Sequence, residues 1–365
     1  MITFILGLAA VVLGLMALVV FHEFGHWIVA RLCGMWTPVF SIGFGPRKYS
    51  LVLGKFWDTE FRLSPIPLGG YVALPEMGDE TSAEEIARAY GAEPRPFKKF
   101  PIWQRMLVAV AGVVMNIIVA AALLFGIFAC KGQPTQYITS TFVAAVSQQV
   151  NIASQAGLQA GDVILSADGK TVVDPQPLVD ELHSHPGKPV VLHIRRASAE
   201  QDITVVPNAN GQIGISIGYN VATKYVPMSV PQAAVRSTKL TFAFTGKIFY
   251  AIAGMAHLVP STPGADASSV HSIVGIAAYG ANTFKTSFVD FLVLLASISL
   301  NLAVFNILPI PMLDGGYVLF FSIEKLRGKP LSVQTQNKLK MFFLYLLLML
   351  FIFGIVNDVR HPMGK

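Results

Sequence analysis

Four long apolar stretches dominate the pattern of hydrophobic and polar residues along the chain. A helix that spans a bilayer needs about 17 to 25 predominantly apolar residues, and each stretch meets that length. The pattern therefore predicts an α-helical integral membrane protein with four transmembrane helices. We do not expect the first stretch to be cleaved as a signal peptide, because no basic residues precede it and its apolar run is too long. The four stretches are residues 3–27, 106–129, 288–308 and 340–356.

Residues 37–75 show a different pattern, in which short alternating runs are separated by glycine and proline. Such runs are typical of β-hairpins, so we expect a membrane-associated β-hairpin region after the first span. Non-helical backbone lies at membrane depth only where protein or a water-filled cavity covers it. The open edge of such a hairpin would take an extended peptide by strand addition. A small cytoplasmic hairpin with no substrate role is the alternative.

Residues 131–222 have the composition of a separate soluble domain. The order A-G-L-x-x-G-D-x-I-x-x-x-D-G at residues 156–169 resembles the PDZ family in its permuted bacterial form, and the length suits one copy. The resemblance implies an inserted α+β domain that binds extended peptides or C-termini by strand addition. We place its peptide site at Gly214 and Ile215, in a loop suited to a carboxylate. A rigid spacer or size filter that binds no peptide is the alternative.

Residues 223–287 form an amphipathic segment with lysine and arginine among large apolar residues. Such a segment is suited to the membrane interface. The part from 240 to 259 is apolar enough to be a partly buried fifth span instead. Lys247 near its middle favours the interfacial interpretation.

The composition agrees with a membrane protein, since 53% of residues are hydrophobic and only 13% are charged. Soluble domains average about 25% charged residues. Ten Lys and Arg lie in 31–105, and four more lie in 309–339. The ten in 131–287 are spread over twice the length. The positive-inside rule therefore puts 31–105 and 309–339 in the cytoplasm and both termini outside, with lipid and not nucleic acid as the partner of the basic residues.

His22-Glu23-Phe24-Gly25-His26 is an H-E-x-x-H motif at the end of a run that carries no charge from Ile2 to Phe21. On a helix the two histidines share a face and can bind one metal ion. Glu23 beside them can take a proton from a water at that metal. Ionisable groups at membrane depth are costly unless they function. The motif therefore predicts a metal site within the first span.

The third span ends in N-x-x-P-x-P-x-x-D-G, from Asn306 to Gly315. Its prolines break the helix and free backbone groups. Asp314 is the only acidic residue between Asp290 and Glu324. A catalytic zinc takes three protein ligands and keeps a fourth position open. We therefore expect His22, His26 and Asp314 to bind one zinc ion.

The paired motifs and the intervening PDZ-like segment resemble the site-2 intramembrane zinc metalloproteases (M50-type), closest to the subgroup of the bacterial regulator of sigma-E protease. The resemblance implies that His22, His26 and Asp314 are zinc ligands, that Glu23 is the catalytic base, and that Asn301 and Asn306 hold the substrate strand. Two departures stand out: this chain has one PDZ segment where the best-known members have two, and residues 270–277 lack the S-G-P-I-G-I-A pattern.

The resemblance implies a peptide-bond hydrolase that cuts single-span membrane proteins within or near the bilayer. Substrates of this kind are anti-sigma factors or remnant signal peptides, often trimmed first by an upstream site-1 protease. The bacterial inner membrane would be its location, with the PDZ domain on the periplasmic side. Two other functions stay open. A catalytically inactive membrane PDZ adaptor would not need all four of the residues His22, Glu23, His26 and Asp314. A metal transporter would need polar residues on several spans.

The expected organisation follows from these patterns. It comprises the first span with the metal motif, the β region and loop, the second span, the PDZ domain, the amphipathic segment, the third span with the aspartate motif, a cytoplasmic loop, and the fourth span with the tail. Their residues are 1–30, 31–105, 106–130, 131–222, 223–287, 288–316, 317–339 and 340–365.

Overall fold

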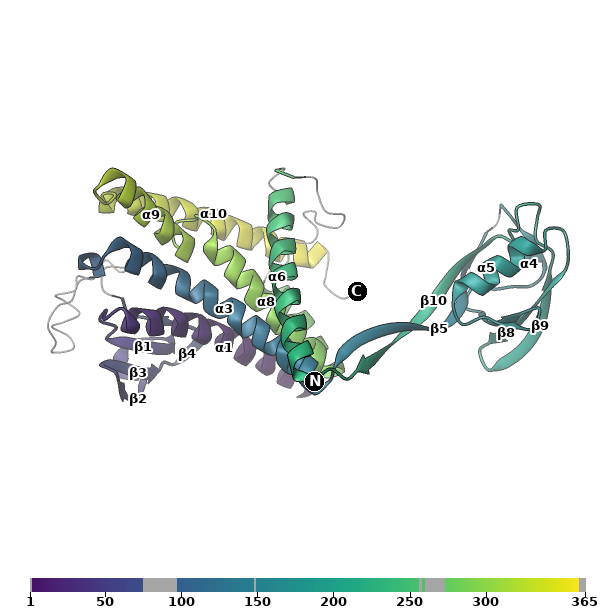
Figure 1. The fold of residues 1–365 in the computed structure, drawn as a ribbon, viewed down its shortest axis with the longest axis horizontal. Helices are drawn as coiled ribbons and strands as arrows, with labels where there is room; N and C mark the ends of the chain where they lie inside the picture. The colour runs from purple at the N-terminus through teal and green to yellow at the C-terminus, as the bar shows by residue number, and fades with distance from the viewer. Residues whose placement is uncertain (1, 75–96, 148, 256–257, 260–272, 361–365) are drawn as a thin grey trace. The chain divides into compact units, whose positions relative to one another are not determined.

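The structure is a computed structural model that describes residues 2–74, 97–147, 149–255, 258–259 and 273–360. The chain divides into two compact units (Figure 1). Unit 1 comprises Met1–Cys130 and Ser229–Lys365, and unit 2 comprises Lys131–Met228.

Unit 1 is mostly helical. Four of its helices are long and apolar enough to cross a membrane, at Ile5–Leu32, Ile102–Cys130, Phe288–Ile307 and Val333–Val356. They agree with the four expected spans. The helices of this unit are α1 (Ile2–Leu32), α3 (Ile102–Cys130), α6 (Val230–Met255), α7 (Ile273–Thr286), α8 (Phe288–Ile307), α9 (Asp314–Arg327) and α10 (Val333–Arg360), with 3-10 turns at Arg47–Tyr49 and Phe97–Lys99.

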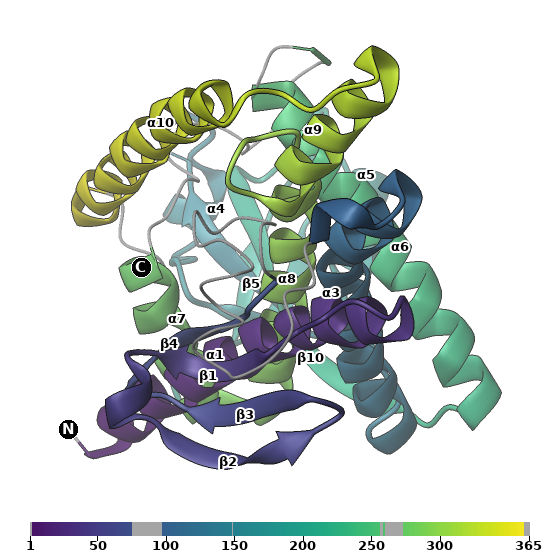
Figure 2. The same ribbon diagram turned by 90° about the vertical axis from the view of Figure 1, so that its left-hand side faces the viewer.

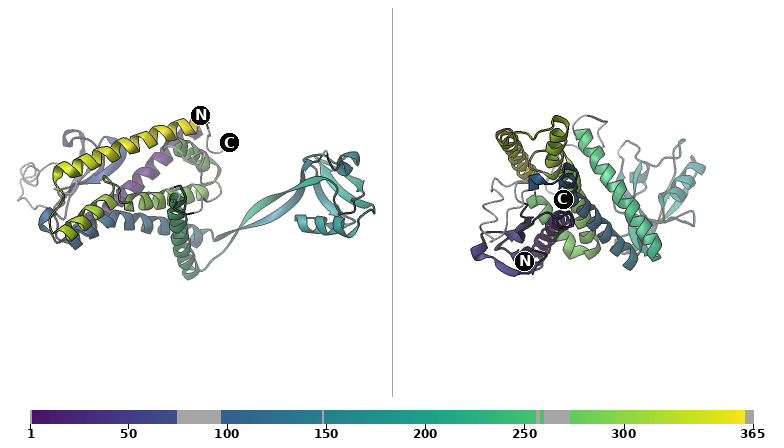
Figure 3. Two further views of the ribbon diagram at one scale, coloured as in Figure 1. Left: turned by 90° about the horizontal axis from the view of Figure 1, so that it is seen from above. Right: turned by 60° about the vertical axis from the view of Figure 1, so that its left-hand side comes forward.

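Helix α3 is central to this unit, because it packs against α1, α6, α8 and α9. Helix α1 also contacts α7 and the sheet described below. By contrast, α10, yellow in Figure 3, exposes apolar side chains along most of its length. Exposed apolar side chains on a helix of this length are suited to contact with lipid.

The chain breaks between α8 and α9 at the expected prolines. Leu308 leaves the helical conformation just before Pro309, as the residue before a proline tends to do. Asp314 then begins α9, which ends at Gly328 in a left-handed conformation. Residues 317–339, expected as a loop, therefore form most of α9 and the start of α10. Burial of apolar side chains explains this difference, since Phe320 and Phe321 of α9 are buried in unit 1.

A four-stranded sheet follows α1, where a hairpin was expected. Its strands are ordered β2-β3-β1-β4, so β4 forms one edge. β1 and β3 are parallel, and the other pairs are antiparallel. β2 and β3 form a hairpin whose turn residues, Trp57 and Asp58, both have positive φ, as a type I′ turn requires. The strands are β1 (Val39–Phe44), β2 (Leu51–Phe56), β3 (Thr59–Leu63) and β4 (Ile66–Val72).

The sheet lies against α1 (Figure 2), and aromatic side chains pack between the two. The Trp27 ring lies 5.3 Å from that of Phe61 and 6.4 Å from that of Phe40. Its indole nitrogen donates to Thr59 Oγ1 at 2.9 Å. These contacts hold β1 and β3 against the helix that carries the two motif histidines, and β4 contacts the same helix. Residues 75–96, which belong to the expected cytoplasmic segment 31–105, lie outside the described residues.

Unit 2 is an antiparallel sheet with two helices and its own apolar core. The strands are ordered β10-β5-β6-β8-β9, with β7 paired to β6. The core includes Val143, Ile164, Leu178, Leu192 and Ile194, all fully buried. Its elements are β5 (Gln133–Val146), α4 (Ile152–Gln155), β6 (Val163–Ala167), β7 (Lys170–Thr171), α5 (Pro175–Ser184), β8 (Val190–Arg196), β9 (Ala199–Val205) and β10 (Ile215–Val226).

The end of unit 2 differs slightly from the expected boundary at residue 222. Strand β10 continues to Val226 and pairs with Gln133 at the start of β5. The first part of the segment 223–287 is therefore strand, and α6 and α7 follow it. Residues 270–272, the start of the stretch 270–277 that lacks the S-G-P-I-G-I-A pattern, lie outside the described residues.

Candidate active site

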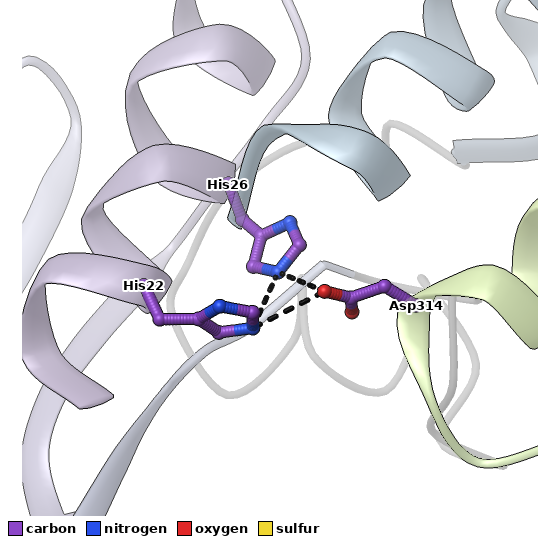
Figure 4. Close-up of side chains that lie close together, drawn as sticks. All are labelled: His22, His26 and Asp314. Carbon is purple, nitrogen blue, oxygen red and sulfur yellow. Dashed lines mark hydrogen bonds and ion pairs between the residues drawn. The ribbon is translucent and has the colours of Figure 1, made fainter. Parts of the chain in front are cut away.

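Three side chains from two distant parts of the sequence meet in unit 1 (Figure 4). His22 and His26 project from α1, and Asp314 projects from the first turn of α9. The two histidine Nε2 atoms are 3.3 Å apart. Asp314 Oδ2 lies 3.2 Å from the Nε2 atom of His22 and 3.4 Å from that of His26. Both histidines are buried, with 8% and 6% of their surface exposed.

This arrangement fits a zinc ion. Bonds of about 2.0–2.1 Å to a tetrahedral zinc place neighbouring ligand atoms about 3.3–3.4 Å apart. The three distances between Nε2 and Oδ2 atoms match this spacing. Asp314 Oδ2 is also a buried atom with no hydrogen-bond partner. A buried carboxylate oxygen of this kind is costly unless a cation faces it.

The backbone of α3 orients His26. Its Nδ1 atom donates to the carbonyl oxygen of Val108 at 2.7 Å. A carbonyl can only accept, so the hydrogen of a neutral ring lies on Nδ1 and the lone pair lies on Nε2. Metal-binding histidines are commonly oriented by such a bond on the other nitrogen.

Glu23 lies next to the histidines but its carboxylate is not one of the three converging groups. Its Oε2 atom accepts a hydrogen bond from the backbone N–H of Val72 at 3.1 Å. Val72 is the last residue of β4. The glutamate is therefore held between the histidine pair and the edge strand of the sheet.

The two asparagines of α8 occupy different environments. Asn306 Nδ2 lies 3.5 Å from His22 Nε2, at the outer limit of a hydrogen bond. Asn301 is exposed, and its amide donates to Ser297 O on its own helix. Residues five apart on a helix point about 140° apart, so the two side chains do not share a face. The structure brings Asn306, and not Asn301, to the histidines.

Gly112 and Asn116 of α3 also face the site, and neither was expected there. Asn116 Nδ2 lies 3.1 Å from His22 Nδ1. A β-carbon at Gly112 would collide with His26 Nε2 and would lie 2.6 Å from His22 Cε1. The sequence carried one signal, because Asn116 is a rare polar residue in the second span. Nothing in the sequence alone indicated which span it faces.

Gly112→Ala is expected to displace both histidines and to weaken zinc retention, because the added methyl group has no room beside the rings. We expect a loss of zinc affinity of about 10-fold or more, the scale seen when ligand orientation is disturbed. Zinc content of purified protein after dialysis against a chelator measures the effect. Gly126→Ala is the matched control, since a β-carbon there has no described neighbour within 4 Å. Equal zinc retention in the two variants would contradict the close fit at Gly112.

Comparison with known proteins agrees with this site. Residues 10–350 match the model of the family Peptidase family M50. A protein of Nostoc sp., provisionally named a zinc metalloprotease, is 34% identical over 98% of this chain and 96% of its own length. A chloroplastic membrane metalloprotease of Arabidopsis thaliana is 32% identical over 94% of this chain and 76% of its own length. This chain therefore belongs to peptidase family M50 and is a zinc metalloprotease.

Proposed function

We propose that the protein is an intramembrane endopeptidase that cleaves single-span membrane proteins within or near the bilayer. The observation that carries the proposal is the ligand set His22, His26 and Asp314, because its two histidines are buried and lie on a candidate membrane span. One zinc ion per chain would be held by these three residues. Zinc, when bound, acts as a Lewis acid that polarises a carbonyl and makes a water nucleophilic at neutral pH.

Glu23 is the general base in this proposal. Its carboxylate takes a proton from the attacking water and returns it to the leaving amine as the peptide C–N bond breaks. Water is thereby added across the bond, which leaves a new carboxyl group and a new amino group. The hydrogen bond from Val72 N–H restrains the carboxylate beside the histidine pair.

The edge strand β4 supports the choice of an extended segment as substrate. A transmembrane helix satisfies its own backbone groups, so it must unwind before a peptide bond is accessible. Strand addition to a free sheet edge would hold the unwound segment. β4 is an edge strand, and its last residue contacts Glu23. Asn306 beside His22 would bind the substrate backbone, whereas the position of Asn301 offers no such support.

Unit 2 is proposed to be the single PDZ domain, placed on the periplasmic side of a bacterial inner membrane together with both termini. Strand β10 is at the sheet edge and contacts α5, as a groove for strand addition requires. Gly214 precedes it with φ of 81°, and a β-carbon there would collide with Val150 O. Gly214 and Ile215 are the proposed peptide contacts. We favour a filter that excludes long substrate ectodomains, which an upstream protease would first shorten.

Deleting residues 131–228 tests the filter. The ends of unit 2 are adjacent, because Gln133 pairs with Val226, so Cys130 can be joined to Ser229. The deletion variant should retain zinc and cleave short single-span substrates, since ligands, base and β4 all belong to unit 1. Substrates with long ectodomains should be cut less selectively than by the full-length protein. A variant that keeps zinc but loses all cleavage would show that unit 2 belongs to the catalytic machinery.

Labelling with a membrane-impermeant thiol reagent tests the topology. Single cysteines are introduced at Lys188 of unit 2 or at Lys329 between α9 and α10, after Cys33 and Cys130 are replaced with serine. In intact cells the first should be labelled and the second should react only after lysis. The reverse pattern would reject the proposed sidedness.

A further inference from the structure

One face of α3 lies along the histidine pair with matching spacing. Val108, Gly112 and Asn116 are each four residues apart, as are His22 and His26, so both sets follow one face of a helix. Val108 O binds His26, Gly112 leaves room for both rings, and the Asn116 amide meets His22. Asn116 is fully buried. Its backbone oxygen also accepts a hydrogen bond from Ser299 Oγ of α8 at 2.8 Å, apart from the side-chain contact with His22.

The heavy-atom contacts of this face indicate where the hydrogens of neutral histidine rings would lie. Because Val108 O accepts from His26 Nδ1, His26 Nε2 carries a lone pair. Asn116 Nδ2 donates to His22 Nδ1, so the hydrogen of the neutral His22 ring lies on Nε2, 3.3 Å from His26 Nε2. In this pattern His22 Nε2 is a donor, with His26 Nε2 at 3.3 Å and Asp314 Oδ2 at 3.2 Å as its neighbouring acceptors. The pattern leaves Asn116 Oδ1 as a buried atom with no hydrogen-bond partner.

Binding of a metal through His22 Nε2 requires a different pattern. The lone pair must then lie on Nε2 and the hydrogen on Nδ1, which needs an acceptor beside it. A half-turn of the Asn116 amide exchanges its nitrogen for its oxygen with little change in shape. Oδ1 would then accept from His22 Nδ1.

We propose that Asn116 is a positioning residue that selects the metal-binding tautomer of His22. An asparagine suits this role because one side chain can donate to Nδ1 in the first pattern and accept from it in the second. Val108 O performs the equivalent task for His26, but only as an acceptor. The inference rests on the proposed zinc site and adds a third helix, α3, to the residues that control it.

Two substitutions at this position separate tautomer selection from packing. Asn116→Leu keeps a similar volume but has no acceptor, whereas Asn116→Asp keeps the shape and is an acceptor only. We expect Asn116→Leu to weaken zinc binding about 10- to 100-fold, and Asn116→Asp to bind zinc within a few-fold of wild type or more tightly. A residue that only packs between helices would show the opposite order, because a carboxylate is costly in an apolar span and leucine is not.

Zinc dissociation constants are measured on the full-length protein in detergent, by competition with a chromogenic chelator. Circular dichroism and thermal unfolding of the chelated variants check that each is folded. Ser299→Ala is the matched control, because it removes the bond to the Asn116 backbone and leaves the amide contact. We expect that control to stay near the wild-type affinity. Asn116→Ala, which also lacks an acceptor, replaces the leucine variant if the latter does not fold.

Wild-type affinity in the folded leucine or alanine variant would overturn the proposal, as would an aspartate variant weakened as much as the leucine variant. His22→Ala separates this outcome from failure of the metal site. If His22→Ala loses zinc while Asn116→Leu retains it, the zinc site stands and only the role of Asn116 is rejected. If His22→Ala binds zinc as the wild type does, the ligand assignment itself is wrong.

Discussion

Replacing Glu23 with glutamine is expected to lower kcat/KM by about 100-fold or more while zinc binding is retained. General acid–base groups contribute on this scale. Glutamine has nearly the same shape, and its amide oxygen can still accept from Val72 N–H, so the local structure should be preserved. It cannot take a proton from water. The loss should therefore appear in the chemical step.

The measurement combines zinc content with cleavage of a model single-span substrate by the purified variant. Retention of zinc serves as an internal control, because the carboxylate of Glu23 is not part of the converging ligand set. Near-normal cleavage would remove Glu23 from the mechanism. Loss of zinc together with activity would instead make Glu23 a ligand or a structural support of the site.

Asp314→Asn is expected to release zinc and abolish cleavage. The substitution keeps the size of the side chain but removes its charge and replaces one oxygen with an amide nitrogen. Asp314 Oδ2 is the only carboxylate oxygen within the described ligand cluster, at 3.2 and 3.4 Å from the histidine nitrogens. Loss of one anionic ligand leaves two neutral imidazoles, a set too small for a catalytic zinc.

Zinc stoichiometry after dialysis against a chelator checks this outcome. Asp290→Asn provides the matched control, because Asp290 is likewise an acidic residue in the first turn of a helix, α8, but is exposed and is not in the described ligand cluster. That control should bind one zinc per chain. A full complement of zinc in Asp314→Asn would refute the three-ligand assignment.

The position of the edge strand depended on tertiary structure. Glycine and proline between alternating runs predicted strands over 37–75, and strands are present there. However, the sequence does not indicate that β1 pairs in parallel with β3, which leaves β4 at the edge beside α1. Pairing between strands is set by side-chain packing across the sheet and on α1, as with Trp27 and Phe61, and not by the local pattern.

The contribution of α3 to the site is even less predictable from the sequence than the position of the edge strand. Nearly all side chains of a transmembrane helix are apolar. Its hydrophobic pattern therefore does not distinguish the face toward lipid from the face toward protein. Gly112 and Asn116 contribute to the site only because α1 packs closely on α3, so that the histidine rings lie against Gly112 and the Asn116 amide and His26 bonds the backbone oxygen of Val108.

The sequence by itself determined the four spans, the H-E-x-x-H pair and the break before Asp314, because each depends on local length, helical spacing or the geometry of proline. Only the tertiary structure decided which groups meet. Residues nearly 300 positions apart converge when α9 packs on α3, where Arg105 binds Glu324 through two hydrogen bonds of 3.0 and 2.7 Å. The rotation of α8 about its axis brings Asn306, and not Asn301, to His22. The rotation of α3 likewise brings Asn116 to His22. That rotation is fixed by packing between helices, which no single helix encodes.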